Sequence, residues 1–379
     1  MAGETKSAAV RGLEGVIAAD TRIGYVDGVN GKLYYAGYDI NDLAGRVCFE
    51  EVVFLLWNDR LPRRDELEKL RKELLEQMVL PQLLRQWLRK VPRGTHPMVL
   101  LRSAVSDLAI YDEEAEDNSG EANRRKAMRL VARISAIIAG YHRTLQRGEV
   151  LPPDPRKSLA ENFLRIFLGR EISKEEAQAI ELMFVLHADH GFNASTFSAR
   201  VTASTLADIY AAITAAIATL TGPLHGGANQ RVMEMLNRIG DASAVDEYID
   251  GMLEKKEKIM GFGHRVYKVE DPRARHLRRV SAALCERDKQ CGYFEMSALI
   301  EKKVKKSLKI YPNVDFYSAT VQHALGIPTD FYTTLFAASR IAGWSAHVLE
   351  QHADNRLMRP RSNFTGRFPR KFVPVSKRN

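Results

Sequence analysis

This 379-residue chain has few cysteines, no long apolar run, no strong excess of one charge and few strand patterns. Each of these absences excludes certain classes of protein. Its three cysteines, Cys48, Cys285 and Cys291, are odd in number, widely spaced and without a CxxC pair. This pattern argues against a disulfide framework and against a zinc site. It predicts three separate thiols in a reducing compartment, by default the cytoplasm.

Long hydrophobic runs are also missing. The most apolar segment, residues 211–220, is short, rich in alanine and flanked by polar residues, which indicates a buried helix rather than a membrane span. The first residues contain no apolar stretch of the kind that a secretory signal requires. We therefore expect a cytoplasmic protein without a membrane partner.

Neither sign of charge dominates the composition. The chain carries 56 Lys+Arg against 47 Asp+Glu, a net charge of +9, which favours anionic ligands without identifying one. The densest basic cluster is the segment 359–378, and no fingerprint of a nucleic-acid module is present. We expect no nucleic-acid partner. A non-catalytic basic protein that binds nucleic acid is the alternative from another functional class.

Strand patterns are nearly absent. Residues 25–37 hold Asp-Gly and Asn-Gly turn dipeptides between aromatic residues, the only convincing hairpin signal. Elsewhere apolar residues recur at helical spacing, as in residues 40–57, 202–220 and the long apolar stretch 331–351. The pattern and the length together predict an all-α protein of two domains with a small N-terminal β-hairpin.

Two of the ten histidines differ from the others in their surroundings. His225 lies in the sequence GPLHGGAN and His264 in GFGHR. Glycines beside an imidazole let backbone and substrate approach it closely, which a core histidine does not require. A carboxylate, Asp315, follows in YPNVDFYS. One base and two hydrogen-bond donors can take a proton from carbon and stabilise the resulting oxyanion, so the chain is predicted to be an enzyme.

A second pair, His187 and His190, stands at i,i+3 spacing in HADH and could bind a metal ion from one helix face. No third ligand of matching spacing follows, so we expect no metal site. A substrate contact from His190 is favoured instead, because the sequence Gly191-Phe-Asn193 ends the helix directly after it.

Five sequence blocks, in this order and spacing, resemble the citrate synthase family in its short bacterial and archaeal form. They are HADHGFNAST (187–196), GPLHGGAN (222–229), GFGHRVYK (261–268), DPR (271–273) and NVDFY (313–317), preceded by KLYYAGYDI (32–40). The resemblance runs from residue 12 to about residue 375. Five blocks in the same order and spacing are specific evidence for this family, whereas any one block alone would be weak evidence.

The resemblance implies a role for each catalytic candidate. Asp315 would remove a methyl proton from acetyl-CoA, and His225 would donate a hydrogen bond to the enol(ate) oxygen as a neutral imidazole. His264 would donate to the ketone oxygen of oxaloacetate. The product would be citryl-CoA, which is hydrolysed to citrate and coenzyme A. The thioester is a substrate, and no cofactor is expected.

Four residues would bind the carboxylates of oxaloacetate by the same resemblance: His190, Arg273, Arg340 and Arg359. Arg340 also stands out on physical grounds, because it interrupts the most apolar helix, where an unpaired charge is costly and should meet an anion. In the family, the arginine at the place of Arg359 reaches the partner subunit's site. An obligate homodimer is therefore implied, and assembly into a hexamer or a larger form stays open.

The coenzyme A contacts implied by the resemblance lie in and after the third block. Lys268 stands where some relatives have arginine, which keeps the charge but weakens a bidentate phosphate contact. The full set is Lys258, Ile259, Gly261, Gly263, Lys268 and Asn313.

The resemblance also implies a division into two domains that close on the substrates. Residues 1–226 and 327–379 would form a large, dimer-forming domain, and residues 227–326 a small mobile one. The alternative within the enzyme class is 2-methylcitrate synthase, which uses propionyl-CoA with the same three catalytic residues. Arg265 stands where that branch often has proline, which favours citrate.

Overall fold

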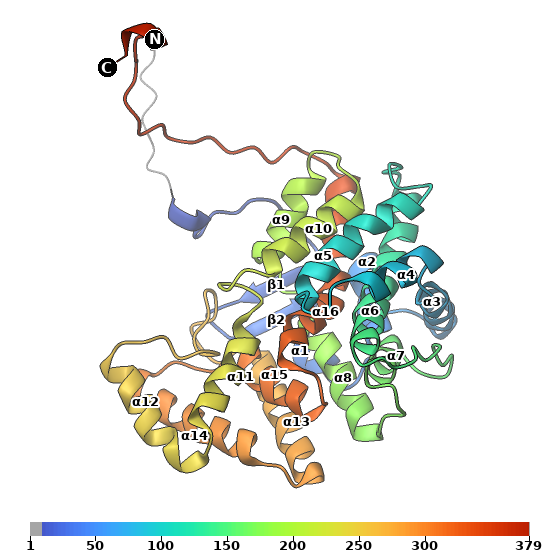
Figure 1. The fold of residues 1–379 in the computed structure, drawn as a ribbon, viewed down its shortest axis with the longest axis vertical. Helices are drawn as coiled ribbons and strands as arrows, with labels where there is room; N and C mark the ends of the chain where they lie inside the picture. The colour runs from blue at the N-terminus through green and yellow to red at the C-terminus, as the bar shows by residue number, and fades with distance from the viewer. Residues whose placement is uncertain (1–9, 379) are drawn as a thin grey trace.

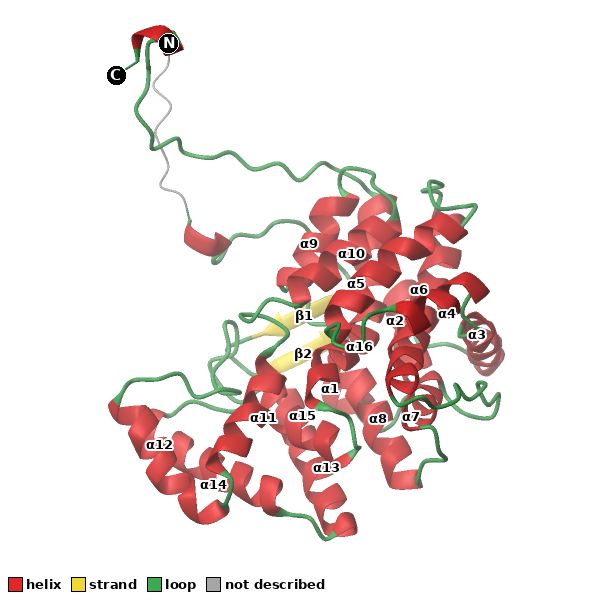
Figure 2. Cartoon of the chain, viewed as in Figure 1, coloured by secondary structure: helices red, strands yellow, loops and turns green. Residues whose placement is uncertain are grey.

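The computed structural model describes residues 10–378, and in that range it contains sixteen α-helices and three short strands (Figure 2). This confirms the predicted all-α class with a small N-terminal sheet. Short 3-10 turns lie at Arg11–Leu13, Leu108–Tyr111, Ala242–Ala244, Thr329–Phe331 and Val375–Lys377. The helices are α1 (Ile40–Leu43), α2 (Phe49–Asn58), α3 (Arg64–Gln77), α4 (Gln82–Lys90), α5 (Pro97–Asp107), α6 (Gly120–Leu145), α7 (Leu159–Leu168), α8 (Lys174–His187), α9 (Ala194–Ala203), α10 (Ile209–Leu220), α11 (Ala228–Ile239), α12 (Val245–Glu254), α13 (Pro272–Asp288), α14 (Gly292–Leu308), α15 (Val314–Ala324) and α16 (Tyr332–Ala353).

The sheet forms where the turn dipeptides predict a hairpin. β1 (Gly24–Asp27) pairs antiparallel with β2 (Lys32–Tyr35), and a third strand, β3 (Tyr38–Asp39), which was not predicted, adds to β2. Tyr35 is fully buried, and its hydroxyl donates to the backbone oxygen of Asp189 (3.0 Å). The sheet therefore supports the segment that carries His190.

The long helix α16 lies at the centre of the molecule, against α6, α8, α9 and α10 (Figure 1). Nearly all of its side chains are buried, as predicted for the stretch 331–351. Residues beyond it run as an extended segment away from the helical body (Figure 1). No helix within residues 10–378 combines the length and the apolar character needed to cross a bilayer.

Two helix predictions are wrong in their limits. Residues 40–57 form two helices, α1 and α2, because Glu51 accepts a hydrogen bond from Cys48 N (2.7 Å) in a capping box that starts a new helix. Residues 202–220 do not form one helix either. The second part, α10, starts only after Asp208, whose carboxylate accepts from Ala211 N.

Five consecutive helices, α11 to α15, gather at the lower left of Figure 1 and pack chiefly on one another. They fall within residues 227–326, the stretch expected to form the small domain. Contacts of α11 with α16 and of α13 with α1 and α8 join this group to the other helices. The domain boundaries and the mobility of this group stay predictions.

A disulfide joins Cys285 and Cys291, so the prediction of three separate thiols is wrong. Cys285 lies in the last turn of α13 and Cys291 directly before α14. The short connection between these helices brings the two Cα atoms to 4.7 Å, within the range in which cysteines can be bridged. This proximity depends on the turn, which cysteine count and spacing do not reveal. Cys48 is a free thiol.

Candidate active site

His225 is held in a tight turn that follows α10. Its backbone N donates to Gly222 O (2.9 Å), and Gly226 N donates to Leu220 O (3.0 Å). A Cβ atom on Gly226 would lie 2.4 Å from Leu220 O, so only glycine fits there. The glycine beside the imidazole is therefore needed to build the turn that presents it.

The proton of His225 can be placed from its partners. The backbone N–H of Ser195 donates to His225 Nε2 (3.3 Å), and Ser195 Oγ lies 2.8 Å from the same atom. An accepting Nε2 leaves the proton of the neutral ring on Nδ1. Ser195 Oγ also accepts from Trp344 Nε1 (3.1 Å) and donates to Asn193 Oδ1 (2.8 Å), so the donor to Nε2 is the backbone N–H. Ser195 lies in the HADHGFNAST block, but no sequence pattern singles it out as a site residue.

His264 is positioned by a short antiparallel pairing of two segments far apart in the chain. Gly263 N donates to Tyr311 O (3.0 Å), and Asn313 N donates to Gly261 O (2.8 Å). Gly261 has a φ of 79°, and a Cβ there would meet the ring of Phe316 at 2.7 Å. The pairing therefore requires glycine, and it brings the His264 loop against the start of α15.

The tautomer of His264 is fixed in the opposite sense to that of His225. Its Nδ1 accepts from the backbone N–H groups of Val266 (3.0 Å) and Tyr267 (3.2 Å). The proton of the neutral ring is therefore on Nε2. The ring centroid of His264 lies 5.1 Å from that of His190, whose Nε2 is 3.2 Å from the hydroxyl of Tyr267. Tyr267, in the GFGHRVYK block, is a further site residue that the sequence did not single out.

Asp315 stands in the first turn of α15, where Asn313 caps the helix by accepting from Asp315 N (3.0 Å). Its carboxylate atom Oδ1 is buried without a hydrogen-bond partner. Burial raises the pKa of Asp315 to about 7, although the positive charges of Arg273 and Arg340 oppose the shift. A carboxyl group with this pKa and a free oxygen is suited to accept a proton near neutral pH.

The imidazoles are kept neutral by the same burial. It lowers the pKa of His225 to about 4, with a contribution from the charge of Arg340. It also lowers the pKa of His264 to about 4, helped by Arg273. The pKa of His190 is likewise well below its usual value, first because of burial and then because of Arg273. All three rings can therefore donate hydrogen bonds at pH 7 without carrying a charge.

Arg273 is a buried cation with a fixed partner. Its Nε and Nη2 donate to the two carboxylate oxygens of Asp271 (3.0 and 2.7 Å), and its side chain is only 2% exposed. Asp271 also accepts from the backbone N of Val314, the residue before Asp315. Asp271 lies in the DPR block, and no sequence pattern predicts a role for it. Its carboxylate ties the start of α13, with Arg273, to the start of α15.

Arg340 is a buried cation without such a partner. It is 1% exposed in the middle of α16, its Nε donates to His187 O (2.6 Å), and the guanidinium lies 4.7 Å from the ring centre of Phe336. Within residues 10–378, no carboxylate lies within ion-pair distance of it. Burial lowers its pKa to about 10, which still leaves it charged at pH 7. The prediction that Arg340 faces an anion therefore has a physical basis.

The family model for the citrate synthase C-terminal domain matches residues 12–361. The chain belongs to the citrate synthase family. It is thus an enzyme of the acyltransferase type, as the sequence blocks predicted.

Individual members of the citrate synthase family match over nearly the whole chain. "Citrate synthase 2" of Bacillus subtilis (strain 168) is 47% identical over 98% of this chain and 99% of its own length. A "Citrate/2-methylcitrate synthase" of the same organism is 40% identical over 94% of this chain and 96% of its own. A citrate synthase of the archaeon Thermoplasma acidophilum, solved in a ternary complex with carboxymethyl coenzyme A and oxaloacetate, has a TM-score of 0.90, 34% identity and coverage of 97% and 98%.

Some of the remaining predicted site residues lie next to His264, whereas others are exposed to solvent. The pairing that positions His264 includes Gly261, Gly263 and Asn313. Ile259, two residues before Gly261, is buried. The side chains of Lys258 and Lys268 are exposed. Arg359 is exposed on the segment beyond α16, so the single chain does not bring it together with the other site residues.

The i,i+3 histidine pair does not form a metal site with other ligands. His187 Nδ1 bonds to Met183 O (2.8 Å) within α8, while His190 turns toward Tyr267. In the described part of the chain, no group of three or more His, Cys, Asp and Glu side chains could hold a metal ion.

Proposed function

We propose that this enzyme condenses acetyl-CoA with oxaloacetate and hydrolyses the resulting citryl-CoA to citrate and coenzyme A, the entry step of the tricarboxylic acid cycle. The observation that carries the proposal is the carboxyl group of Asp315, whose Oδ1 is buried without a hydrogen-bond partner and whose pKa is raised to about 7. The charge of Arg340, a buried cation without an ion-pair partner, acts on both Asp315 and His225, and the charge of Arg273 acts on both Asp315 and His264.

In the first step, Asp315 takes a proton from the methyl group of acetyl-CoA. The thioester oxygen gains negative charge, and the Nδ1–H of His225 donates a hydrogen bond to it. A neutral donor stabilises this oxygen without transferring a full charge. Ser195 supports the step from the other side of the ring, because its hydrogen bond to Nε2 keeps the proton on Nδ1.

In the second step, the enol(ate) carbon attacks the ketone carbon of oxaloacetate. The Nε2–H of His264 donates to the ketone oxygen and stabilises the alkoxide that forms, a contribution worth about 3–4 kcal/mol for one such donor. Water then cleaves the thioester of citryl-CoA, and coenzyme A leaves as a thiol.

Oxaloacetate carries two carboxylates, and the buried cations supply the matching charge. We assign Arg340 and Arg273 to these carboxylates, with His190 as a hydrogen-bond donor. Arg359 is assigned to the site of a second subunit, which the exposed position of this residue permits. An obligate homodimer follows from that assignment.

Coenzyme A is assigned to the exposed loop between α12 and α13. Lys258 and Lys268 provide positive charge for its phosphates. The backbone at Ile259, Gly261 and Gly263 is assigned to the same ligand, together with Asn313, whose side-chain amide donates to Gly263 O. Closure of residues 227–326 over this loop would exclude water from the enol(ate). A cytoplasmic location completes the proposal.

Release of free thiol from acetyl-CoA and from propionyl-CoA, with oxaloacetate present, tests the proposal. One methylene in an apolar pocket is worth about 1–3 kcal/mol, so we expect kcat/KM to favour acetyl-CoA by roughly 10-fold or more. Omitting oxaloacetate gives the control for simple hydrolysis. Equal or greater kcat/KM with propionyl-CoA would instead assign the enzyme to 2-methylcitrate synthesis.

The pH dependence follows from the pKa of Asp315. Only its deprotonated form can act as a base, so at saturating oxaloacetate we expect kcat/KM for acetyl-CoA to rise with pH and level off above about pH 7. His225 and His264, with pKa values of about 4, stay neutral over this range and add no second step. A rate that stays constant from pH 8 down to pH 5 would contradict the raised pKa.

A further inference from the structure

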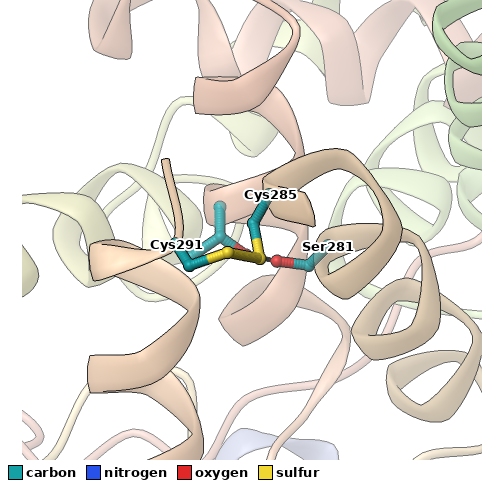
Figure 3. The surroundings of a disulfide bond; sticks show 4 residues. Ser281, Cys285 and Cys291 are labelled. Carbon is teal, nitrogen blue, oxygen red and sulfur yellow. Dashed lines mark hydrogen bonds between the residues drawn. A yellow bond between two sulfur atoms is a disulfide. The ribbon is translucent and has the colours of Figure 1, made fainter. Parts of the chain in front are cut away.

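The connection between α13 and α14 carries the disulfide between Cys285 and Cys291 (Figure 3). The turn that joins these helices is held by main-chain hydrogen bonds, from Gln290 N to Cys285 O (3.1 Å) and from Lys289 N to Glu286 O (3.4 Å). These bonds do not involve the sulfur atoms. The turn therefore favours keeping the two cysteines together when the S–S bond is broken, as a reversible pair requires.

A cavity of about 320 Å³ borders the disulfide. It lies between α13, α14 and α15, and its walls include Cys285, Tyr293, His323 and the exposed Gln290. Cys285 is only 6% exposed, so a reagent would approach it through this cavity. The cavity gives a small thiol access that a disulfide enclosed in a core would not offer.

The two sulfur atoms have different electrostatic surroundings. Cys291 is the N-cap residue of α14, a helix of 17 residues, where the partial positive charge of the helix end favours a thiolate. Cys285 lies at the C-terminal end of α13, where the partial charge is negative. Cys291 is therefore the better leaving group when a thiolate attacks the sulfur of Cys285.

We propose that Cys285 and Cys291 form a redox modification site that reacts with a small dithiol. A thiolate of the dithiol attacks Cys285 Sγ, the S–S bond breaks, and Cys291 leaves as a thiolate. The second thiol of the reagent attacks the mixed disulfide and releases Cys285. Two electrons and two protons pass to the protein while the dithiol becomes a disulfide. In reducing compartments, protein disulfides are typically transient and redox-sensing.

Reduction changes the attachment of α14 rather than the catalytic end of α13. One turn before Cys285, Ser281 Oγ lies 2.7 Å from Thr320 Oγ1, so α13 remains bound to α15 without the disulfide (Figure 3). Arg273 stands at the opposite end of α13. The expected consequence is lower local stability of residues 285–300, with the catalytic side chains still in place.

Thermal unfolding of the oxidised protein with and without dithiothreitol tests this site. Opening such a short loop is expected to lower the unfolding midpoint by roughly 3–5 °C and to speed amide hydrogen exchange in residues 285–300. Reoxidation should restore both values. The Cys48→Ser variant is the matched control and should keep the full response, whereas the double variant Cys285→Ser/Cys291→Ser should unfold at the lower midpoint with or without reductant.

Alkylation under denaturing conditions followed by mass spectrometry gives a readout that does not depend on any variant. We expect one alkylated cysteine per chain before dithiothreitol and three after it. Three alkylated cysteines in protein that was never reduced would overturn the proposal, as would an unchanged midpoint on reduction or a response that persists in the double variant.

Discussion

Replacing Asp315 with asparagine is expected to lower kcat by roughly 10³-fold, within the range that removal of a general base produces. Asparagine preserves the shape of the side chain and the helix position but cannot take a proton from carbon. Thiol release from acetyl-CoA in the presence of oxaloacetate measures the effect. An Asp315→Asn variant that kept substantial activity would rule out Asp315 as the base.

The same substitution should stabilise the protein at alkaline pH. The pKa of Asp315 is about 7 in the folded state and 3.8 in the unfolded state. The charged carboxylate therefore lowers the free energy of unfolding, fully above pH 7 and progressively less as the pH falls toward 3.8. We therefore expect Asp315→Asn to unfold at a higher temperature than the wild type at pH 8, with the difference shrinking steadily below pH 7 and vanishing only near pH 3.8. A loss of activity combined with a gain in stability separates a catalytic effect from misfolding.

Replacing Arg340 with methionine is expected to raise KM for oxaloacetate by about 10²–10³-fold, the cost of removing one partner of a buried charge pair. The substitution leaves no carboxylate behind in the free enzyme, because Arg340 has no ion-pair partner among the described residues. Folding should therefore be retained. The variant removes a costly buried charge but also the bond to His187 O and the attraction of Asp189 and Asp315, so we expect only a small change in the unfolding midpoint. Initial rates at varied oxaloacetate and saturating acetyl-CoA measure the effect.

Arg200 provides the matched control for Arg340. It is also buried, but it pairs with Glu350 and bonds to Gln351. Arg200→Met should leave the partner carboxylate unpaired and lower stability, while KM for oxaloacetate changes little. The account of Arg340 would be contradicted if the two variants gave the same pattern, or if Arg340→Met left KM unchanged.

The catalytic candidates could be found from sequence because each leaves a local signal. Glycines mark the turns of His225 and His264, and the structure shows why: Gly226 and Gly261 leave no room for a Cβ atom. Arg340 was detectable because a cation interrupts an apolar helix, and it is indeed buried.

Other features depend on contacts between distant segments and leave no such signal. The tautomer of His225 is set by Ser195, thirty positions away, and the bond between Asp271 and Val314 joins the starts of two helices. The disulfide depends on the conformation of a short turn. The predicted role of Arg359 requires a second chain, so no pattern within one chain fixes its position.

Periodicity identified the helices more reliably than their ends. Residues 40–57 and 202–220 have continuous apolar spacing, yet capping by Glu51 and Asp208 starts a new helix within each stretch. Side-chain capping competes with helix continuation over one or two residues, which a period of 3.6 residues averages over.

Asp315, His225 and His264 are expected to act together on one pair of bound substrates. A crystal structure of the protein with oxaloacetate and carboxymethyl coenzyme A, an analogue of the enol, tests it most directly. We predict that Asp315 and His225 Nδ1 lie within hydrogen-bond distance, about 2.6–3.2 Å, of the carboxymethyl group, while His264 Nε2 contacts the ketone oxygen. A complex in which any of the three side chains fails to reach its ligand would contradict the account.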